Sequence, residues 1–212
     1  MSAFLVSFVA VGLSLTGPSG AHAGGTQVVV AAVAGDVWVT TGFDVVKVDA
    51  ATGRVLRRSE ARYPYLVGLG AGDGNIWVSS VEDGFVSGAV TRIPDGAGRV
   101  TQPLVLPSQP VLALAVGSGT TWALVGPWSA LRLAAIDQAT GKATLKPIRD
   151  VGWIAADDTG GTPGLFGVSM RGKAVRISRE DTVGWTADTE RIESPAVVGL
   201  GSVWVAGNDT LY

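Results

Sequence analysis

Short apolar runs alternate with Gly-rich turns along this chain, and no long stretch has the 3.6-residue spacing of an amphipathic helix. The first copy of the pattern has an apolar run at 28–33, a Gly-rich approach at 34–36 and an aromatic strand around Trp38. An alternating strand at 45–49, a tight turn and another strand at 54–57 follow. Four short strands separated by tight turns predict an all-β fold.

The same pattern returns about every forty residues, and an aromatic residue flanked by small or β-branched residues marks each copy. These aromatics are Trp38, Trp77, Trp122, Phe166 and Trp204, at intervals of 39, 45, 44 and 38 residues. Repeats of four short strands are typical of a β-propeller, because a single blade exposes both faces and only its neighbours can bury them. We therefore expect the five aromatics to lie between adjacent sheets.

Two turns of the repeat are nearly identical: residues 49–54 read DAATGR, and residues 137–142 read DQATGK. The Asp carboxylate can accept backbone N–H groups across such a turn, and Gly takes the positive φ that other residues resist. Together with the segment Gly-x-Val-Trp-Val at 35–39, this hairpin resembles bacterial YVTN and virginiamycin-B-lyase-like propellers. The hairpin alone is also similar to the repeat of PQQ-binding quinoproteins. The resemblance covers about 26–212 and implies a fold more than an activity.

The repeat predicts a β-propeller domain over residues 24–212, with four full blades ending near Ile192. A fifth blade stops after its second strand, so we expect an incomplete ring or a fragment of a longer repeat protein. The alternative is a compact four-bladed ring in which the last half-blade completes the first.

Residues 1–23 have the features of a secretory signal peptide. The run 3–15 is apolar and uncharged, Gly17 and Pro18 break it, and Ala21 and Ala23 are small residues at the positions that a signal peptidase recognises. We expect cleavage after Ala23, which predicts a secreted or extracytoplasmic bacterial protein without a stable membrane anchor. An uncleaved anchor and a misplaced start codon are the alternatives.

The composition excludes several classes of partner and of side-chain chemistry. The net charge is −2, so there is no broad basic field to attract nucleic acid or an anionic membrane. The chain has no cysteine, which excludes disulfides, thiolate chemistry and cysteine metal sites. Its single histidine, His22, lies in the predicted signal peptide.

Loop lengths indicate where a ligand would bind. The distance from the blade aromatic to the following turn Asp is 11 residues in the first blade, 18 in the second and 15 in the third. In propellers resembling this one, the lengthened loop and the blade-to-blade connections surround the mouth of the central channel. We predict that a partner protein or small molecule binds there, because loops often carry function. The predicted ligand-binding residues are Tyr63, Tyr65, Phe85 and Trp128.

The two resembling enzyme classes have requirements that this sequence does not meet. A virginiamycin-B-lyase-like enzyme would use a histidine base and Mg²⁺, and the expected mature chain has no histidine. A quinoprotein would stack PQQ on tryptophan and hold Ca²⁺, but Arg57 and Leu145 occupy the positions of the closing tryptophan. We therefore expect a non-catalytic binding or scaffold module with no catalytic residue, cofactor or metal. A fragment of either propeller enzyme is the alternative.

Overall fold

The structure is a computed structural model in which strands form antiparallel sheets. It describes residues 30–33, 36–41, 44–60, 63, 65–82, 84, 86–96, 104–106, 109–157, 164–169, 171, 173–177, 183–188, 197–199 and 202–204. Within these residues four sheets have four strands each and one has two. The all-β prediction is confirmed.

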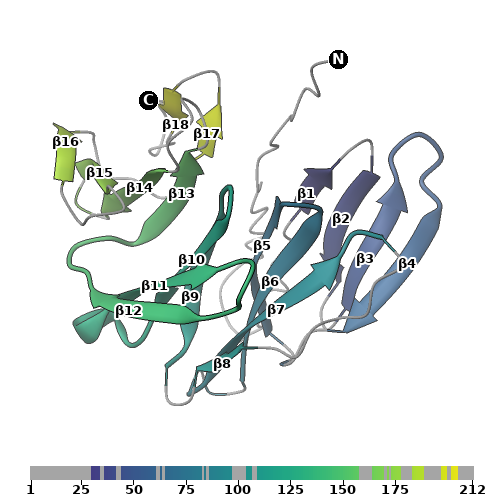
Figure 1. Cartoon of the computed structure of the whole chain (residues 1–212), viewed down its shortest axis with the longest axis horizontal. Helices are drawn as coiled ribbons and strands as arrows, with labels where there is room; N and C mark the ends of the chain where they lie inside the picture. Colours follow the sequence, from purple (N-terminus) through teal and green to yellow (C-terminus); the bar gives the residue numbers. More distant parts are fainter. Residues whose placement is uncertain are drawn as a thin grey trace, which may run out of the picture.

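The sheets are numbered here in chain order (Figure 1). Sheet 1 consists of β1 (Val30–Val33), β2 (Asp36–Thr41), β3 (Asp44–Asp49) and β4 (Val55–Glu60). Sheet 2 consists of β5 (Tyr65–Gly72), β6 (Asn75–Val81), β7 (Gly88–Pro94) and β8 (Leu104–Leu106). Sheet 3 consists of β9 (Val111–Val116), β10 (Thr120–Val125), β11 (Arg132–Asp137) and β12 (Ala143–Pro147), with the short 3₁₀ turn η2 (Trp128–Ala130) between β10 and β11. Sheet 4 consists of β13 (Trp153–Asp157), β14 (Gly164–Ser169), β15 (Lys173–Ile177) and β16 (Val183–Asp188), and sheet 5 of β17 (Val197–Gly199) and β18 (Ser202–Trp204).

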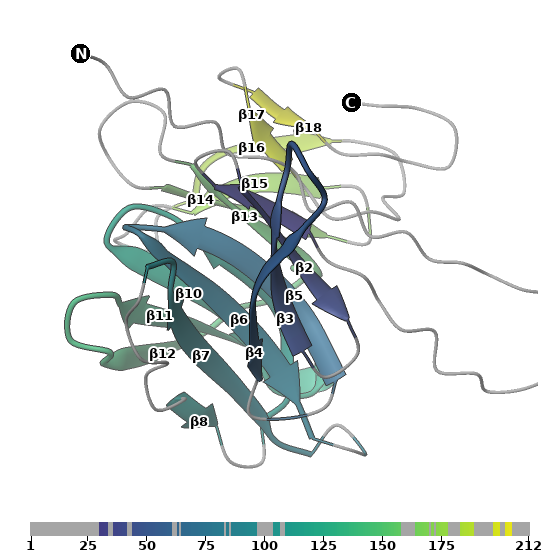
Figure 2. The same ribbon diagram turned by 90° about the vertical axis from the view of Figure 1, so that its right-hand side faces the viewer.

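Strand order within each sheet follows the chain, and neighbouring sheets meet through their first strands. β5 contacts both β1 and β9, and β13 contacts both β9 and β17. Figure 1 shows the five sheets following one another around an arc, with β1 and β17 toward its two ends, and Figure 2 shows the same sheets from the side. This is the sequential radial packing that the forty-residue repeat predicts.

The repeat aromatics pack between sheets. Trp38 is fully buried, in a cluster that includes Leu69 and Ile93 of sheet 2. Trp77 packs with Val111 of sheet 3, and the same arrangement continues one sheet further along. Burial of roughly 200 Å² per tryptophan at about 25 cal/mol/Å² stabilises each such contact by up to about 5 kcal/mol.

The prediction about these aromatics is confirmed for three of the five. Besides Trp38 and Trp77, Trp122 packs in a cluster with Ile154 of sheet 4. Phe166 is buried in β14, and Trp204 lies in β18, where its side chain is outside the described part of the structure.

The residue directly opposite each aromatic on the third strand forms a second repeated feature, which the sequence analysis missed. The register pairs are Trp38 with Lys47, Trp77 with Arg92, Trp122 with Ala135, and Phe166 with Arg176. Two of these cations lie over the paired ring: Lys47 Nζ is 5.7 Å from the Trp38 centroid, and Arg176 Cζ is 6.0 Å from that of Phe166. At these distances a cation is attracted to the face of the ring.

Glycines of β5 let sheet 2 approach sheet 3 closely. A Cβ added to Gly70 would lie 2.6 Å from Val116 Cγ2, and one added to Gly68 would lie 2.7 Å from Leu114 Cβ. Both distances are too short for a real Cβ, so only glycine permits this packing of the two first strands. Close approach thus accounts for Gly70 and Gly72, whereas Gly74 has a positive φ of 69° in the turn that leads into β6.

The two similar turns have the predicted hydrogen bonds. Asp49 Oδ1 accepts the N–H groups of Ala51 and Thr52 at 3.0 and 2.8 Å. Asp137 Oδ1 accepts the Thr140 N–H at 2.7 Å. The glycines of the two turns, at positions 53 and 141, have φ of 71° and 70°.

Candidate functional site

Loops and sheet-to-sheet connections meet at one edge of the sheets, called the loop edge here. It comprises the loop after β6, the loop after β10 with η2, and the residues that lead into β5, β9 and β13. In sheet 2 the Tyr63 N–H donates to Ser80 Oγ at 3.3 Å, near the end of β6. In sheet 3 the Gly126 N–H donates to the Pro110 carbonyl at 2.9 Å. The expectation that these loops and connections share one edge is confirmed for both sheets.

Two of the four predicted ligand-binding residues have described positions at this edge of sheet 2. Tyr65 begins β5 opposite Val81 and is 45% exposed, while Tyr63 is half-buried just before the strand. Val86, in the loop after β6, is 57% exposed and was not among the predicted residues. Tyr65 and Val86 are therefore two large side chains that are exposed at the loop edge.

The other two predicted residues contribute less to the described geometry. Phe85 lies outside the described residues. Trp128 begins η2, at the loop edge of sheet 3, and its side chain is outside the described part. A role in ligand binding remains a prediction for Tyr63, Tyr65, Phe85 and Trp128.

The loop edges of sheets 2 and 3 are joined. A Cβ on Gly88, the first residue of β7, would lie 2.6 Å from both Val111 N and Val111 Cγ2 and 3.0 Å from the Gln109 carbonyl oxygen. The chain entering β9 therefore packs directly on the end of the loop after β6. Since Pro110 in turn accepts the Gly126 N–H, one set of backbone contacts connects both loops.

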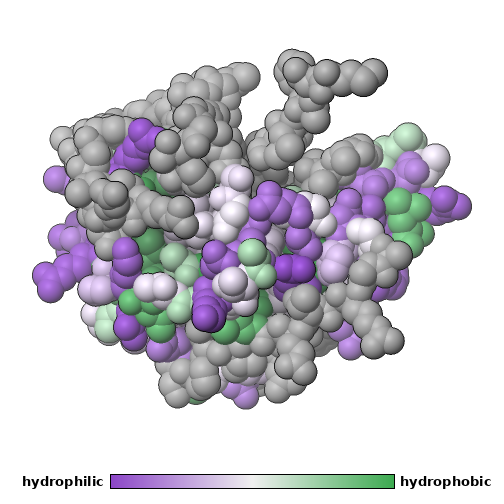
Figure 3. Space-filling model, in the orientation of Figure 1, coloured by the Kyte–Doolittle hydropathy of each residue, from purple (hydrophilic) through white to green (hydrophobic). Residues whose placement is uncertain are grey.

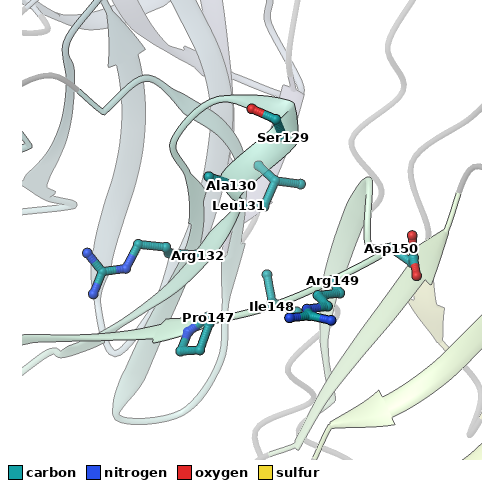
Figure 4. A pocket seen from close by; sticks show the side chains of 8 residues that line it. All are labelled: Ser129, Ala130, Leu131, Arg132, Pro147, Ile148, Arg149 and Asp150. Atoms are coloured by element: carbon teal, nitrogen blue, oxygen red, sulfur yellow. The ribbon is translucent and has the colours of Figure 1, made fainter.

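A hollow of about 610 Å³ opens at the loop edge of sheet 3 (Figure 4). It lies between the segment that follows η2 and the connection from β12 to β13, which are linked by the Ile148 N–H donating to the Leu131 carbonyl at 3.1 Å. The lining residues are Ser129, Ala130, Leu131, Arg132, Pro147, Ile148, Arg149 and Asp150. Figure 4 shows Leu131 and Ile148 in the middle, with Arg132 and Asp150 toward opposite sides.

The charged residues of the hollow were missed by the sequence analysis. Arg132, Arg149 and Asp150 are all exposed, and Asp150 has a left-handed φ of 56°. Within the described part of the chain, neither guanidinium of the hollow takes part in a hydrogen bond or an ion pair. The sequence signal was weak, because the two arginines are 17 positions apart and their segments come together only through tertiary contacts, the pairing of β11 with β12 and the bond from Ile148 to Leu131.

Arg57 and Arg92, in contrast, bond to neighbouring sheets. Arg57 donates to the carbonyl oxygens of Pro94 and Gly96 at 2.8 and 2.7 Å, and Arg92 donates to that of Gln138 at 2.9 Å. These bonds join neighbouring sheets, so these arginines hold the fold together. Among the residues that the structure describes, the guanidiniums of the hollow have no such bond.

A second charged cluster joins sheets 1 and 2. Lys47 Nζ lies 2.8 Å from a carboxylate oxygen of Asp36 and 2.8 Å from one of Asp95. Burial lowers the pKa of Lys47, but hydrogen bonds and charge attraction from the two carboxylates outweigh burial and hold it above the ordinary value. The two carboxylates neutralise the Lys47 charge where the two sheets meet, so we interpret this cluster as structural.

Asp73 links the turn after β5 to sheet 3. Its carboxylate accepts the Gly119 N–H of sheet 3 at 2.9 Å, and its carbonyl accepts the Asn75 amide at 2.7 Å. Residues 73 and 74 form the turn between β5 and β6, and these bonds hold it in place. Among the residues that the structure describes, no group of three or more His, Asp or Glu side chains could hold a metal ion.

No protein-family model and no curated protein sequence matches this chain. Solved structures do match, and one of them is the β-propeller domain of Cps50 (Swd1) from Myceliophteria thermophila. The two share 12% sequence identity with a TM-score of 0.64, and the match covers 82% of this chain and 60% of that domain's chain. Identity this low shows the fold alone. The chain therefore has a β-propeller fold and spans 60% of the length of the propeller that it resembles.

Proposed function

We propose that this protein is a secreted, non-catalytic β-propeller module that binds a partner protein or small molecule at its loop edge. The observation that carries the proposal is the position of the available groups. The exposed Tyr65 and Val86 and the hollow of sheet 3 all lie at the edge that bears the lengthened loops. Loops held by a rigid scaffold are the usual place for binding residues.

The scaffold itself supports a binding role. Buried tryptophans, close glycine packing and cation bonds hold neighbouring sheets together, and this packing gives the loops a common scaffold. A preformed surface loses little conformational entropy when a partner binds. This property suits a module whose work is recognition.

We also propose the finer features of the fold. Sheets 1 to 4 are blades and sheet 5 is part of a fifth, in an incomplete ring of YVTN or virginiamycin-B-lyase-like repeats. The arc in Figure 1, with β1 and β17 toward its ends, supports this arrangement. So do the repeated DAATGR and DQATGK turns.

Secretion is proposed on the strength of the leader at residues 1–23, which lie outside the described part. Nowhere in the described residues is there a helix with the length and apolar character needed to cross a membrane.

The non-catalytic character is proposed from the residues available for chemistry. After the leader the chain contains no histidine and no cysteine. At the positions where a quinoprotein repeat would have its closing tryptophan, Arg57 bonds to sheet 2, and Leu145 packs against the cluster of Trp77. A fragment of a lyase-like or quinoprotein-like enzyme is the second candidate.

Chemical-shift mapping tests the proposal. The full chain, labelled with ¹⁵N, is titrated with a library of small organic fragments and followed by two-dimensional NMR. We expect the largest shifts at the amides of Tyr65 and Val86 and in the segments 129–132 and 148–150. Shifts confined to the opposite edge, where the turn 50–54 lies, would contradict the proposed site. Steady turnover of a streptogramin or an alcohol would contradict the non-catalytic role.

A further inference from the structure

We propose that the hollow of sheet 3 recognises the carboxylate side chains of an extended acidic segment of a partner protein. This inference rests on the proposed binding function and names the chemistry of the ligand.

Charge is the first argument. Arg132 and Arg149 line the hollow as exposed cations, and in the described residues neither has a protein partner. A guanidinium presents a planar fork of N–H donors that matches a carboxylate, and such charge-assisted bonds are stronger than neutral ones. Two such groups from adjacent segments can bind two acidic side chains of one ligand.

Size and shape are the second argument. At about 610 Å³ the hollow is within the usual range for ligand pockets of roughly 300–1,000 Å³, and is larger than one inorganic anion needs. It follows two neighbouring chain segments, 129–132 and 147–150, held together by the pairing of Arg132 with Pro147. A ligand with the same extended form, such as a short peptide segment, fits along them.

The apolar residues that line the hollow between its charged side chains favour a peptide as the ligand. Leu131, Pro147 and Ile148 provide an apolar floor, and Figure 4 shows the first and last of these in the middle of the hollow. An apolar side chain placed between acidic residues would contact this floor while the carboxylates reach the arginines. The ligand is therefore expected to combine acidic residues with an apolar one.

Asp150 limits how much negative charge the hollow accepts. Its carboxylate lies toward the side opposite Arg132 in Figure 4, and it is exposed. An acidic ligand is repelled there, so removal of this charge should strengthen binding. Substitution of Asp150 should therefore change the affinity in the opposite direction to substitution of either arginine.

The experiment uses the full chain and two fluorescein-labelled peptides, followed by fluorescence anisotropy. The probe is acetyl-Glu-Glu-Leu-Glu-Glu-amide, and its neutral counterpart has Gln at each Glu position. We expect the Glu peptide to bind about tenfold more tightly than the Gln peptide. Arg132→Gln and Arg149→Gln should each weaken binding of the Glu peptide about threefold, and Asp150→Asn should strengthen it about twofold.

Arg54→Gln is the matched control, because Arg54 is an exposed arginine in the turn between β3 and β4, away from the hollow. It should leave the affinity unchanged. All four substituted side chains are exposed, so each variant should fold, and thermal unfolding checks this.

Three results would overturn the inference: equal affinity for the Glu and Gln peptides, unchanged affinity in both arginine variants, or no binding of either peptide. The proposed function fails on a different result, namely fragment shifts that map away from the loop edge. The two failures are therefore distinguishable.

Discussion

Lys47 of sheet 1 reaches across to sheet 2, where its Nζ lies 2.8 Å from Asp95 Oδ1. The same oxygen accepts the Trp38 indole N–H at 3.1 Å, so a cation and an aromatic from adjacent strands share one carboxylate. Sheet 2 contacts sheet 3 in a similar way, through Arg92 and the Gln138 carbonyl oxygen. A third-strand cation that bonds to the next sheet is thus a recurring contact between sheets.

Removal of the Lys47 charge should destabilise the fold in a pH-dependent manner. The pKa of Lys47 in the folded protein is raised above 10.5, the value taken for the unfolded chain. The resulting stabilisation is fully present below pH 10.5 and is lost as the pH rises through the folded pKa. We expect Lys47→Met to lower the free energy of unfolding by about 1–2 kcal/mol at neutral pH.

Urea unfolding of wild type and Lys47→Met across a pH series measures this difference. It should shrink above pH 10.5, when the wild-type lysine loses its proton. A difference that stays constant through the alkaline range would show that packing of the side chain, and not its charge, joins the sheets. Arg58→Met is a suitable control, because Arg58 forms a largely exposed ion pair with Asp44.

Glycine at position 70 should be required for the contact between sheets 2 and 3. Gly70→Ala places a Cβ within 2.6 Å of Val116 Cγ2, so the two first strands must separate or Val116 must move. We expect a loss of about 1–3 kcal/mol in the free energy of unfolding, as is usual for overpacking. Gly96→Ala serves as the control, since an added Cβ there has no atom within 4 Å. Equal stability of the two variants, measured by chemical denaturation, would refute the close-packing argument.

Trp38 and Trp128 should differ in their contributions to stability and to ligand binding. Trp38 is fully buried between sheets, so Trp38→Ala should cost about 3–5 kcal/mol. Trp128 begins η2 in a lengthened loop, so Trp128→Ala should remain within about 1 kcal/mol of wild type while weakening a ligand at the loop edge. Paired denaturation curves measure the costs. If Trp128→Ala unfolds as readily as Trp38→Ala, then Trp128 belongs to the core and not to the binding surface.

Asp49 should titrate below its ordinary value. The backbone N–H of Thr52 lowers its pKa most, followed by the Thr52 hydroxyl. Burial opposes these two effects, and the Ala51 N–H and the Arg54 charge lower the pKa further. The stabilisation that this turn contributes is therefore present above pH 3.8, the pKa taken for the unfolded chain. It is lost as the pH falls through the lower pKa of the folded protein.

NMR titration of the Asp49 carboxylate carbon measures this pKa directly. Thr52→Val removes the hydroxyl and keeps the backbone N–H, so it should raise the pKa part of the way toward the ordinary value. No change on substitution would mean that the hydroxyl does not bond to the carboxylate in solution.

The candidate site was only partly predictable. The repeat pattern assigned Tyr63 and Tyr65 to the connection between the first two blades, and Tyr65 does pair with Val81 at the end of β6. This assignment was possible because the order of strands and connections within a repeat is a local property of the chain. The hollow with Arg132 and Arg149 escaped prediction, since its two walls come from separate segments. Val55 and Leu56 of β4 are also exposed hydrophobic residues. Figure 3 shows hydrophobic and hydrophilic residues interspersed on the face that it draws.

The sequence by itself determined the features that arise within one repeat. Alternating strands, tight turns with glycine at 53 and 141, and the spacing of the aromatics depend on residues close together in the chain, where backbone preference and periodicity act. Tertiary structure alone decided which side chains meet across sheets. Lys47 and Asp95 are 48 residues apart, and Gly70 and Val116 are 46 apart. Their contacts depend on how one sheet packs on the next, which no local pattern specifies.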